Sequence, residues 1–569
     1  MNYREQYQIW CNEPSMPADM KQRLAAMEAD EQEVKGCFGA ELQFGTAGIR
    51  GVMDVGTNRL NVFTVRRTAQ GLAAWLCGTD LPKKCAIAYD SRHNSRYYAE
   101  LCAAALAEKN IHVYIYHELA PTPMLSYAVR QLGCGCGIVV SASHNAGIYN
   151  GIKCYGADGC QMTDEPAKIV FDEISSIPYF RPAEKDFDTL KAEGIITDIP
   201  MELWNRYYDR VMQEGMRLDM VPNAKLNVVY TPLCGTGNKP VREMMRRLGV
   251  NTTVVKVQEN PDGDFKTCEY PNPETDAALN ESYKVAQEVP CDLILGTDPD
   301  CDRVAIAVPV DGGFQKLTGN ELGCLLLDYI LQTRSERGDL PKGAFAVRSI
   351  VSSALADKIC AKYGCEMHAV LTGFKWIGGE ILSYEQRGEE DKFVFGFEES
   401  CGYLKGTYAR DKDAVVASML VCEMAAFYKT KGMNLVDAMN ALYKEYGYYM
   451  AKVQSIELSG ADAMEKAAAL MAGIRSNCPE NIGGYPVTAV LDYKSGTKTD
   501  TATGAVTEIT LPRSNVVELQ LGESGRVIAR PSGTEPKVKF YYTAIGACVN
   551  CAGKIMSKLV EGMKSFIPQ

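Results

Sequence analysis

Short apolar runs rich in β-branched residues alternate with helix-like segments in the first quarter of the chain, and this alternation limits the possible folds more than any other feature. Strands that alternate with helices form a parallel sheet covered by helices on both faces. We therefore expect an α/β fold built around such a sheet. The expected elements are helices at 61–77, 97–109 and 123–132, and strands at 85–89, 111–116 and 136–140.

The same alternation continues beyond this region and divides the chain into several units. A length of 569 residues predicts about three to five domains of ~100–200 residues each. An acidic amphipathic helix is expected to begin at Ser15 and Pro17 and to continue to about residue 35. Later strands are expected at 226–230, 253–257, 293–295, 487–491 and 516–520, and later helices after Pro240, at 414–428 and at 548–565. The breaks between these patterns predict four domains, at residues 1–206, 207–318, 319–447 and 448–569.

Charge and hydropathy limit the partners of the chain. Its formal net charge is −11, which argues against a nucleic-acid or anionic-membrane surface. No run approaches ~18 uninterrupted apolar residues, so no transmembrane helix is expected. The first ten residues lack a basic-then-apolar signal pattern. We therefore expect a cytoplasmic protein that binds neither nucleic acid nor a membrane.

Two short patterns that suggest cofactor sites do not hold on closer inspection. The 21 cysteines form no regular framework, so we expect free thiols, mostly buried. Cys548 and Cys551 have the spacing of half a zinc site but lack a second pair. Gly235 and Gly237 suggest a dinucleotide loop, but Pro240 stands where the third glycine belongs.

A serine loop, residues 141–148, follows the expected strand at 136–140. Ser141 and Ser143 leave this strand at its carboxyl end, where ligands and reacting groups gather in open α/β sheets. Serine is a poor nucleophile unless a neighbour activates it or a charged group is delivered to it, and His144 stands beside Ser143. Taken alone, this segment favours an ordinary polar turn at the end of a strand.

Three carboxylates form a second candidate site after another apolar run. Asp298, Asp300 and Asp302 alternate with other residues, and such acids can converge on one hard cation, which suits Mg²⁺ and its preference for carboxylate and phosphate oxygens. A calcium EF-hand loop is excluded, because Arg303 stands where glycine is needed and Pro309 where glutamate is needed. A solvated acidic turn remains the alternative.

Two further loops carry groups suited to a phosphate and to a sugar. Residues 530–537, RPSGTEPK, combine Arg530 with two hydroxyls and a glycine, a set that can wrap a phosphate or form a decorated β-turn. Residues 395–403, FGFEESCGY, place Glu398 and Glu399 side by side after a strand-like run. Paired glutamates suit contacts to adjacent sugar hydroxyls, and an exposed acidic loop is the alternative.

Five motifs in this order resemble the α-D-phosphohexomutase superfamily, and most closely its phosphoglucomutase branch. The likeness runs through nearly the whole chain, and its form is similar to the subgroup that also contains phosphopentomutases and sugar-bisphosphate synthases. The resemblance implies three αβ domains with mixed or parallel sheets and a C-terminal α+β domain around a central cleft. The motifs are FGTAGIRG at 44–51, SASHNA at 141–146, DPDCDR at 298–303, FEES at 397–400 and RPSGTEP at 530–536.

The resemblance also implies how the motif residues act. Ser143 is similar to the family's phosphoserine, which gives its phosphoryl group to one sugar position and regains one from the other, through a bound sugar bisphosphate that turns around. The ligands of one Mg²⁺ per chain would be Asp298, Asp300 and Asp302, together with the phosphorylated Ser143. Glucose 1,6-bisphosphate is the expected activator. The four domains would each contribute one loop: the serine, metal, sugar and phosphate loops.

The remaining site residues are implied by the same resemblance. Arg50, His144 and Lys153 match positions that line the reaction centre, and Arg303 falls where the family steadies the phosphoryl group. Lys412 matches a lysine proposed as acid or base, although the chemistry of His144 makes it an equal candidate. The residues expected to bind substrate are Thr372, Gly373, Lys375, Glu398, Ser400, Arg530, Ser532, Gly533 and Thr534.

Several positions depart from the family pattern. Ser141 replaces a threonine, and because residues two apart in a strand project the same way, it is a rival phosphosite to Ser143. Cys301 replaces a small residue inside the metal loop and is expected to face away, because thiolates suit softer metals than Mg²⁺. Phe397 replaces a glycine and predicts a narrower sugar pocket.

Three functions are consistent with these residues. The leading one is interconversion of glucose 1-phosphate and glucose 6-phosphate, since residues 398–403, EESCGY, resemble the glucose branch. The nearby alternative is a phosphopentomutase or a glucose 1,6-bisphosphate synthase, against which Ser400 weighs modestly. The alternative of a different class is a sugar-phosphate-binding protein without catalysis, which predicts loss of catalytic groups that are in fact present. A monomer or a homodimer is expected.

Overall fold

The computed structural model describes residues 2–45, 47–458, 463–532 and 537–566, and the chain divides into two compact units. Two elements pass from one unit into the other: α15 (Phe374–Glu385) and β14 (Phe393–Glu398). No described helix is both long enough and apolar enough to cross a membrane. The first unit contains Met1–Leu317, Ile377–Phe395 and Ser400–Gly432, and the second contains Thr318–Trp376, Gly396–Glu399 and Met433–Gln569.

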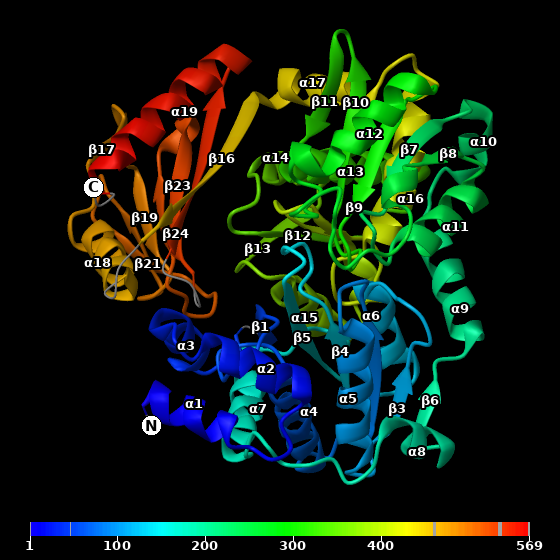
Figure 1. Cartoon of the computed structure of the whole chain (residues 1–569). Helices are drawn as coiled ribbons and strands as arrows, with labels where there is room; N and C mark the ends of the chain where they lie inside the picture. The colour runs from blue at the N-terminus through cyan, green and yellow to red at the C-terminus, as the bar shows by residue number, and fades with distance from the viewer. Residues whose placement is uncertain (1, 46, 459–462, 533–536, 567–569) are drawn as a thin grey trace. The chain divides into compact units, whose positions relative to one another are not determined.

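The first sheet of the first unit has six strands in the order β1-β5-β4-β2-β3-β6 (Figure 1). Its last four strands run parallel, as the alternating pattern predicted, but β5 lies antiparallel to β4, and β1 antiparallel to β5. The sheet is therefore mixed, which agrees with the mixed or parallel sheets that the resemblance implied. Its edge is antiparallel because the chain turns directly back after the serine loop instead of crossing through a helix. The strands are β1 (Gly48–Val52), β2 (Lys84–Tyr89), β3 (His112–Ile115), β4 (Cys136–Val140), β5 (Tyr149–Gly156) and β6 (Ile196–Asp198).

Helices cover both faces of this sheet, because neighbouring strand residues point in opposite directions. Ile138 of β4 belongs to the apolar core that helices α4, α5 and α7 share with the sheet. A Cβ on its neighbour Gly137 would instead meet Leu125 and Val129 of α6. Three of the four helices begin within two residues of the predicted positions: α4 (Val62–Cys77), α5 (Ser95–Ala107) and α6 (Thr122–Gln131), followed by α7 (Asp164–Ser176).

The N-terminal segment forms three helices instead of the one long helix predicted. The second helix ends at Met27, and Asp30 caps the third, since its side chain accepts the backbone N–H of Glu33 at 3.0 Å. The first helix begins with a capping box between Asn2 and Glu5, a pattern that the sequence shows. Trp10 packs edge-on against other aromatic rings in the core of this segment. The helices are α1 (Tyr3–Cys11), α2 (Ala18–Met27) and α3 (Glu31–Phe38).

The second sheet of the first unit has five strands in the order β11-β10-β9-β7-β8. β7, β8 and β9 are parallel, whereas β10 and β11 are antiparallel additions. The strand expected at 253–257 ends earlier, at Val254, because the chain then enters a short 3₁₀ turn. The strands are β7 (Asn227–Thr231), β8 (Asn251–Val254), β9 (Leu293–Thr297), β10 (Val304–Val310) and β11 (Gly313–Leu317).

Further helices and one short strand complete the first unit. The largest of the helices, α16, begins where the side chain of Asp413 accepts two backbone N–H groups, and it ends one residue beyond the prediction. The elements are α8 (Phe187–Ala192), α9 (Met201–Met212), α10 (Val221–Ala224), α11 (Asn238–Leu248), α12 (Asp276–Glu288), β15 (Gly402–Leu404) and α16 (Ala414–Lys429).

The second unit begins with a long helix capped at both ends. Thr318 and Glu321 form a capping box at its start, and Gly338 ends it with a left-handed backbone at φ 70°. The strands β12 and β13 that follow α13 pair in parallel, with Ser349 opposite Val370. The elements are α13 (Gly319–Arg337), β12 (Phe345–Ser349), α14 (Leu355–Tyr363), β13 (Glu366–Val370) and α17 (Leu435–Tyr446).

The rest of the second unit is a seven-stranded antiparallel sheet in the order β16-β24-β23-β22-β19-β20-β21. Phe540 and Val527 point to the face that α18 and α19 cover, whereas their neighbours Tyr541 and Ile528 point to the opposite face. The elements are β16 (Tyr448–Glu457), α18 (Ala463–Ser476), the hairpin β17 (Asn481–Ile482) and β18 (Tyr485–Pro486), β19 (Ala489–Asp492), β20 (Thr497–Asp500), β21 (Val506–Glu508), β22 (Val517–Gln520), β23 (Gly525–Pro531), β24 (Lys537–Gly546) and α19 (Val549–Met563).

Candidate active site

The serine loop turns the hydroxyl of Ser143 toward the acidic cluster. Ser143 has a left-handed backbone, with φ 54°, which costs free energy in a residue other than glycine. Its Oγ donates to Oδ2 of Asp298 at 2.9 Å and lies 3.0 Å from Nδ1 of His144. Ser141 is turned inward, where its Oγ accepts the backbone N–H of Ser143 at 2.8 Å. Of the two rival serines, Ser143 therefore faces the acids.

Arg92 holds the serine loop in this conformation, although it was not among the predicted site residues. Its guanidinium donates to backbone carbonyl oxygens at four points of the loop region. One nitrogen reaches Ser143 at 2.6 Å and Asn145 at 2.5 Å, and the other reaches Ala146 at 2.8 Å and Tyr149 at 2.9 Å. Five donors in a rigid fork suit this role.

Arg92 is itself fixed by its surroundings. Its Nε lies 3.2 Å from Oδ2 of Asp90, and both side chains are fully buried. The ring of Phe265, from the loop after β8, lies 5.0 Å from the guanidinium. The other oxygen of Asp90 accepts from Ser95 at 2.6 Å, at the start of α5. The sheet, a helix and a loop of the neighbouring sheet thus combine to position one arginine.

Three buried aspartates lie together between β9 and β10. One ligand oxygen from each of Asp298, Asp300 and Asp302 lies within 4.8 Å of the others. The second oxygen of Asp298 accepts the backbone N–H groups of Asp302 and Arg303, each at 3.0 Å, which folds the loop back on itself. Cys301, in a left-handed backbone, is buried and is not part of this cluster, as predicted.

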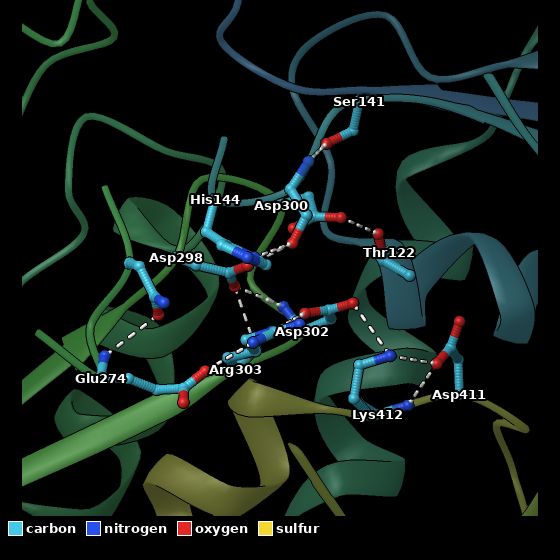
Figure 2. Close-up of polar contacts among 12 residues, drawn as sticks. Thr122, Ser141, His144, Glu274, Asp298, Asp300, Asp302, Arg303, Asp411 and Lys412 are labelled. Carbon is cyan, nitrogen blue, oxygen red and sulfur yellow. Dashed lines mark hydrogen bonds and ion pairs between the residues drawn. The ribbon is translucent and has the colours of Figure 1, made fainter. Parts of the chain in front are cut away.

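The cluster has both cationic neighbours and unused acceptors (Figure 2). Lys153 lies 2.5 Å from Oδ2 of Asp300 and 3.5 Å from Oδ2 of Asp302, and Lys412 lies 3.1 Å from the same Asp302 oxygen. The other oxygens, Oδ1 of Asp300 and Oδ1 of Asp302, are buried and have no hydrogen-bond partner among the described residues, although Nε of Arg303 lies 3.8 Å from the Asp302 oxygen. A buried carboxylate oxygen without a partner is costly, so these two oxygens fit the ligand set of a hard cation.

Burial and mutual repulsion separate the acids electrostatically. Burial, followed by the charges of Asp300 and Asp302, raises the pKa of Asp298 well above its usual value. For Asp300, burial acts in the same direction, but the ion pair with Lys153 and hydrogen bonds outweigh it and lower the pKa. Without a cation, ionisation is therefore least favourable at Asp298, the aspartate that faces Ser143.

Elements far apart in the sequence support this cluster. Thr122, the first residue of α6, donates its hydroxyl to Oδ2 of Asp300 at 2.9 Å and its backbone N–H to the Asp300 carbonyl at 2.9 Å. A Cβ on Gly235 would approach the Cα of Pro299 within 2.4 Å. Gly235 and Gly237, just before α11, therefore allow close packing against the metal loop. This packing accounts for the two glycines without a dinucleotide loop.

Three other predicted residues surround the reacting serine. The Arg303 side chain pairs with Glu274 at 2.6 Å, and Arg50 of β1 donates to the side chain of Asn145 at 3.2 Å. Burial, followed by the charges of Arg303 and Arg50, lowers the pKa of His144 well below 6.5. Its imidazole is thus neutral beside the Ser143 hydroxyl.

The ammonium group of Lys412 lies between two buried acids, Asp302 and Asp411. Besides Asp302, it contacts Asp411 at 2.9 Å, and the hydroxyl of Tyr155 donates to the second oxygen of Asp411 at 2.8 Å. A Cβ on Gly402 would lie 2.2 Å from Cδ of Lys412, so a larger residue there would displace the lysine side chain. Two acidic neighbours favour the charged form of the lysine.

The predicted sugar residues lie partly in the second unit. There, Glu398 is buried, and its Oε1 accepts the backbone N–H of Gly373 at 2.7 Å. The hydroxyl of Thr372 is buried without a hydrogen-bond partner among the described residues. Lys375, three residues later in the sequence, is also buried. Ser400 belongs to the first unit, partly buried in the turn before β15.

Phe397 and Glu399 lie in the same region. The position of Phe397 differs from the prediction, and the contacts of Glu399 were not predicted. Phe397 is fully buried, and a Cβ on Gly323 of α13 would lie 2.4 Å from its ring. It packs inside the domain and lines no open surface, so the prediction that it narrows the sugar pocket is wrong. Glu399 accepts the hydroxyls of Ser349 at 3.1 Å and Ser352 at 3.4 Å, contacts that no sequence pattern indicated.

The phosphate loop connects β23 to β24. Arg530 lies near the end of β23 opposite Lys539, and the backbone N–H of Ser532 donates to the Lys537 carbonyl at 2.8 Å. This bond closes the base of the loop. Two other predicted residues, Gly533 and Thr534, lie outside the described residues.

All four domains of one protein family match the chain in order. Family models described as phosphoglucomutase/phosphomannomutase alpha/beta/alpha domains I, II and III match residues 41–179, 205–312 and 318–446, and the model of the C-terminal domain matches 474–544. The chain belongs to the phosphoglucomutase/phosphomannomutase family. The resemblance noted from the motifs is therefore confirmed, together with the four-domain α/β architecture.

Individual members of the phosphoglucomutase/phosphomannomutase family extend this finding. The phosphoglucomutase of Staphylococcus epidermidis is 35% identical over 517 residues, which is 90% of this chain and 92% of that protein. The phosphoglucomutase of Staphylococcus aureus strain bovine RF122 is 35% identical over 507 residues, 89% of this chain and 90% of that protein. These relatives match across nearly their full length.

Solved structures share the fold at lower identity. A phosphoglucomutase/phosphomannomutase family protein from Burkholderia thailandensis has a TM-score of 0.65 at 16% identity, covering 92% of this chain and 97% of that one. The open form of the Paramecium phosphoglucomutase pp63/parafusin has a TM-score of 0.64 at 17% identity, covering 93% and 97%. At these identities the likeness supports the fold.

Proposed function

We propose that this family member is a phosphoglucomutase, an isomerase that interconverts glucose 1-phosphate and glucose 6-phosphate through a phosphoserine and glucose 1,6-bisphosphate. The observation that carries the proposal is the contact of 2.9 Å between Oγ of Ser143 and Asp298, within a cluster of three buried aspartates. The curated relatives named phosphoglucomutase, at 35% identity over 90% of the chain, support the same reaction.

The donor set supports Mg²⁺ as the cofactor, with Asp298, Asp300, Asp302 and the phosphorylated Ser143 as ligands. All are hard oxygen donors, and two buried aspartate oxygens have no hydrogen-bond partner among the described residues. When bound, Mg²⁺ would neutralise charge on the phosphoryl group. The chain supplies the remaining charge cancellation through Lys153, which already contacts two of the acids.

In the first transfer, the phosphoryl group on Ser143 passes to the free hydroxyl of the bound sugar phosphate, which yields the bisphosphate and the free serine. In the second, Ser143 takes the other phosphoryl group from the turned bisphosphate. Arg303 is positioned to offset charge on the moving group, and Glu274 orients its guanidinium. The protein contributes mainly position and charge to such a transfer.

Two residues are assigned to proton transfer on opposite sides of the phosphorus. His144 lies 3.0 Å from Oγ of Ser143, and the negative charge of a phosphoryl group on Oγ favours the protonated imidazole. We therefore assign to His144 the proton that Oγ gains when it loses the phosphoryl group, a step that leaves the imidazole neutral beside the free hydroxyl. The attacking and leaving oxygens are roughly in line in phosphoryl transfer, so the proton of the sugar hydroxyl leaves on the far side. Lys412 is the candidate there, and it must first release its own proton.

We assign substrate recognition to the sugar loop, residues 395–403, to residues 372–375 and to the phosphate loop, residues 530–537. Glu398 and Ser400 would contact sugar hydroxyls, beside a Thr372 hydroxyl that has no hydrogen-bond partner among the described residues. Arg530 and Ser532, at the base of the phosphate loop, would hold the phosphate that is not transferred. The substrate-binding set is completed by Gly373, Lys375, Gly533 and Thr534.

The decisive experiment compares kcat/KM for glucose 1-phosphate and ribose 1-phosphate, with Mg²⁺ and catalytic glucose 1,6-bisphosphate present. A clear preference for glucose 1-phosphate is expected, with loss of turnover on chelation of the metal and recovery on adding Mg²⁺. A preference for ribose 1-phosphate would reassign the enzyme as a phosphopentomutase. Net accumulation of glucose 1,6-bisphosphate in place of glucose 6-phosphate would indicate a synthase, and absence of turnover with either sugar would contradict catalysis.

A further inference from the structure

Two cysteines outside the proposed active site stand together at the start of α19. Cys548 is the N-cap of this helix, and its Sγ accepts the backbone N–H of Cys551 at 3.2 Å. Cys551 is exposed and Cys548 is partly exposed, whereas most of the 21 cysteines are buried. A small reagent in solvent can therefore reach this pair and not the buried thiols.

The two thiols differ in how readily they ionise. Hydrogen bonds from the Cys551 side chain and backbone lower the pKa of Cys548, whereas the Cys548 side chain raises the pKa of Cys551. The N-cap position also places the Cys548 sulfur beside the unpaired N–H groups of the helix start, which favour negative charge. A thiolate is the reactive form of cysteine, so Cys548 is the attacking group and Cys551 the resolving group.

We propose that Cys548 and Cys551 form a redox-active dithiol that a low-molecular-weight disulfide converts reversibly into an intramolecular disulfide. The Cys548 thiolate attacks one sulfur of the small disulfide, which forms a mixed disulfide and releases one small thiolate. The Cys551 thiol then loses its proton, attacks Sγ of Cys548 and releases the second small thiolate. The protein loses two electrons and two protons, and the small disulfide becomes two thiols.

A metal site is the rival for the same residues, and the structure weighs against it. A structural zinc site uses four protein ligands. Within the described residues, Asp298, Asp300 and Asp302 are the one group of three or more His, Cys, Asp or Glu side chains close enough to share an ion. Cys548 and Cys551 alone leave half of a zinc site unfilled, whereas two thiols three residues apart at a helix start suffice for a disulfide.

Cys548 and Cys551 lie at the turn between β24 and α19. Gly546, two residues before Cys548, pairs with Tyr448, the first residue of β16. The turn between β24 and α19 is tight, since a Cβ on Gly546 would lie 2.5 Å from the backbone nitrogen of Ala552. Gly447, with φ 94°, ends α17 just before β16. The disulfide would therefore form beside the point where the chain enters the last sheet.

The test uses the full-length enzyme and mixtures of reduced and oxidised glutathione. After each equilibration, free thiols are alkylated and the protein is cleaved after lysine and arginine, which leaves both cysteines on residues 540–554 with no other cysteine. As the oxidised fraction rises, this peptide should lose both alkylation sites and two hydrogen atoms, and a dithiol reductant should restore them. A peptide that remains fully alkylated even in oxidised glutathione alone would overturn the proposal.

Two variants and an internal control separate the roles of the two cysteines. Cys551→Ser should stop at a glutathione adduct on Cys548, because no resolving thiol remains, whereas Cys548→Ser should slow the reaction of Cys551 by ~10-fold or more. Cys77, exposed but without a partner cysteine, serves as the control in every sample and should react more slowly than Cys548. Equal rates at Cys77 and Cys548, or zinc that binds stoichiometrically and protects both Cys548 and Cys551, would contradict the proposal.

Discussion

The candidate reaction centre in the first unit and the candidate recognition residues in the second hold their carboxylates in different ways. Asp300 and Asp302 are met by the ammonium groups of Lys153 and Lys412. Glu398 accepts a backbone N–H, and Glu399 accepts serine hydroxyls. A transferred phosphoryl group carries charge that must be cancelled, whereas sugar hydroxyls are neutral and need oriented acceptors. The two regions therefore divide the chemistry into cancelling charge and reading shape.

This division suits a substrate that must bind in two orientations. The charged centre acts on whichever phosphoryl group is presented, so it has no need to distinguish the two ends of the sugar. The contacts with a backbone N–H and with serine hydroxyls fix the direction in which Glu398 and Glu399 can accept further hydrogen bonds. We therefore expect substitutions in the first region to lower kcat and those in the second to raise KM. Three variants with matched controls test this contrast, and a fourth tests the solvation of the second region.

The largest effect is expected at the reacting hydroxyl. Ser143→Ala should lower kcat by ~10³-fold or more with the fold intact, because no other group can carry the phosphoryl between positions. Stopped assays of glucose 6-phosphate formation measure the loss. Ser141→Ala is the matched control and should keep most of the activity, because the Ser141 hydroxyl accepts the backbone N–H of Ser143 and interacts with Asp90, whereas the Ser143 hydroxyl donates to Asp298. Full activity in Ser143→Ala with loss in Ser141→Ala would reverse the assignment.

A smaller effect is expected where the structure acts through the backbone. Arg92→Lys removes the fork that binds four carbonyl oxygens, so Ser143 should lose its alignment with Asp298. Misplacement by about 1 Å costs up to ~10²-fold, so we expect kcat to fall by ~10- to 100-fold with KM nearly unchanged. Arg96→Lys, on the exposed side of α5, should leave both constants unchanged. An unchanged kcat in Arg92→Lys would show that the serine loop holds its own shape.

Arg92 also shows why part of the site was hidden in the sequence. Ser143 and the three aspartates follow apolar strands, so the edge of a sheet could be predicted for them. Asp90 and Arg92 also follow a strand, β2, and the same rule would have indicated them. The rule does not predict that the Arg92 guanidinium contacts the backbone carbonyls of a loop some 50 residues later. That contact depends on how the ends of β2 and β4 pack against each other.

The fold divides in the same way between local and distant causes. Helices with clear caps and apolar periodicity, such as α4 and α16, were predicted within two residues because their signals are local. The antiparallel return of β5 depends on pairing with β4 and β1, which no local pattern specifies. The burial of Phe397 against Gly323 is likewise a contact between distant segments. The boundaries of the four domains and the number of subunits remain predictions.

In the second region, the expected change is in substrate affinity. Glu398→Gln keeps an oxygen acceptor for Gly373 but removes the negative charge, which weakens bonds to two sugar hydroxyls. We expect KM for glucose 1-phosphate to rise by about tenfold, equivalent to the loss of one charged hydrogen bond, with a smaller change in kcat. Glu399→Gln is the matched variant, and its KM should change less because Ser349 and Ser352 already occupy that carboxylate. The opposite order of KM values would make Glu399 the hydroxyl reader.

The smallest effect concerns stability at high pH in the same region. Burial, followed by the charge of Glu399, raises the pKa of Tyr541 from 10 to about 12. The folded state thus keeps this proton to a higher pH than the unfolded chain. The resulting stability is complete below pH 10 and is lost as the pH rises from 10 to 12, by about 1.4 kcal/mol at pH 11. Tyr541→Phe has no proton to lose there, so its free energy of unfolding should fall less steeply between pH 9 and 11 in urea titrations.

Tyr97→Phe provides the control for this titration, since Tyr97 is 49% exposed on α5. Its free energy of unfolding should follow that of the unmodified protein at every pH. If Tyr541→Phe also follows that curve, the phenol ionises equally in the folded and unfolded chains, and Tyr541 is open to water beside Glu399. The second region would then be solvated at the sheet face that carries Tyr541, and water would screen the charge of Glu399.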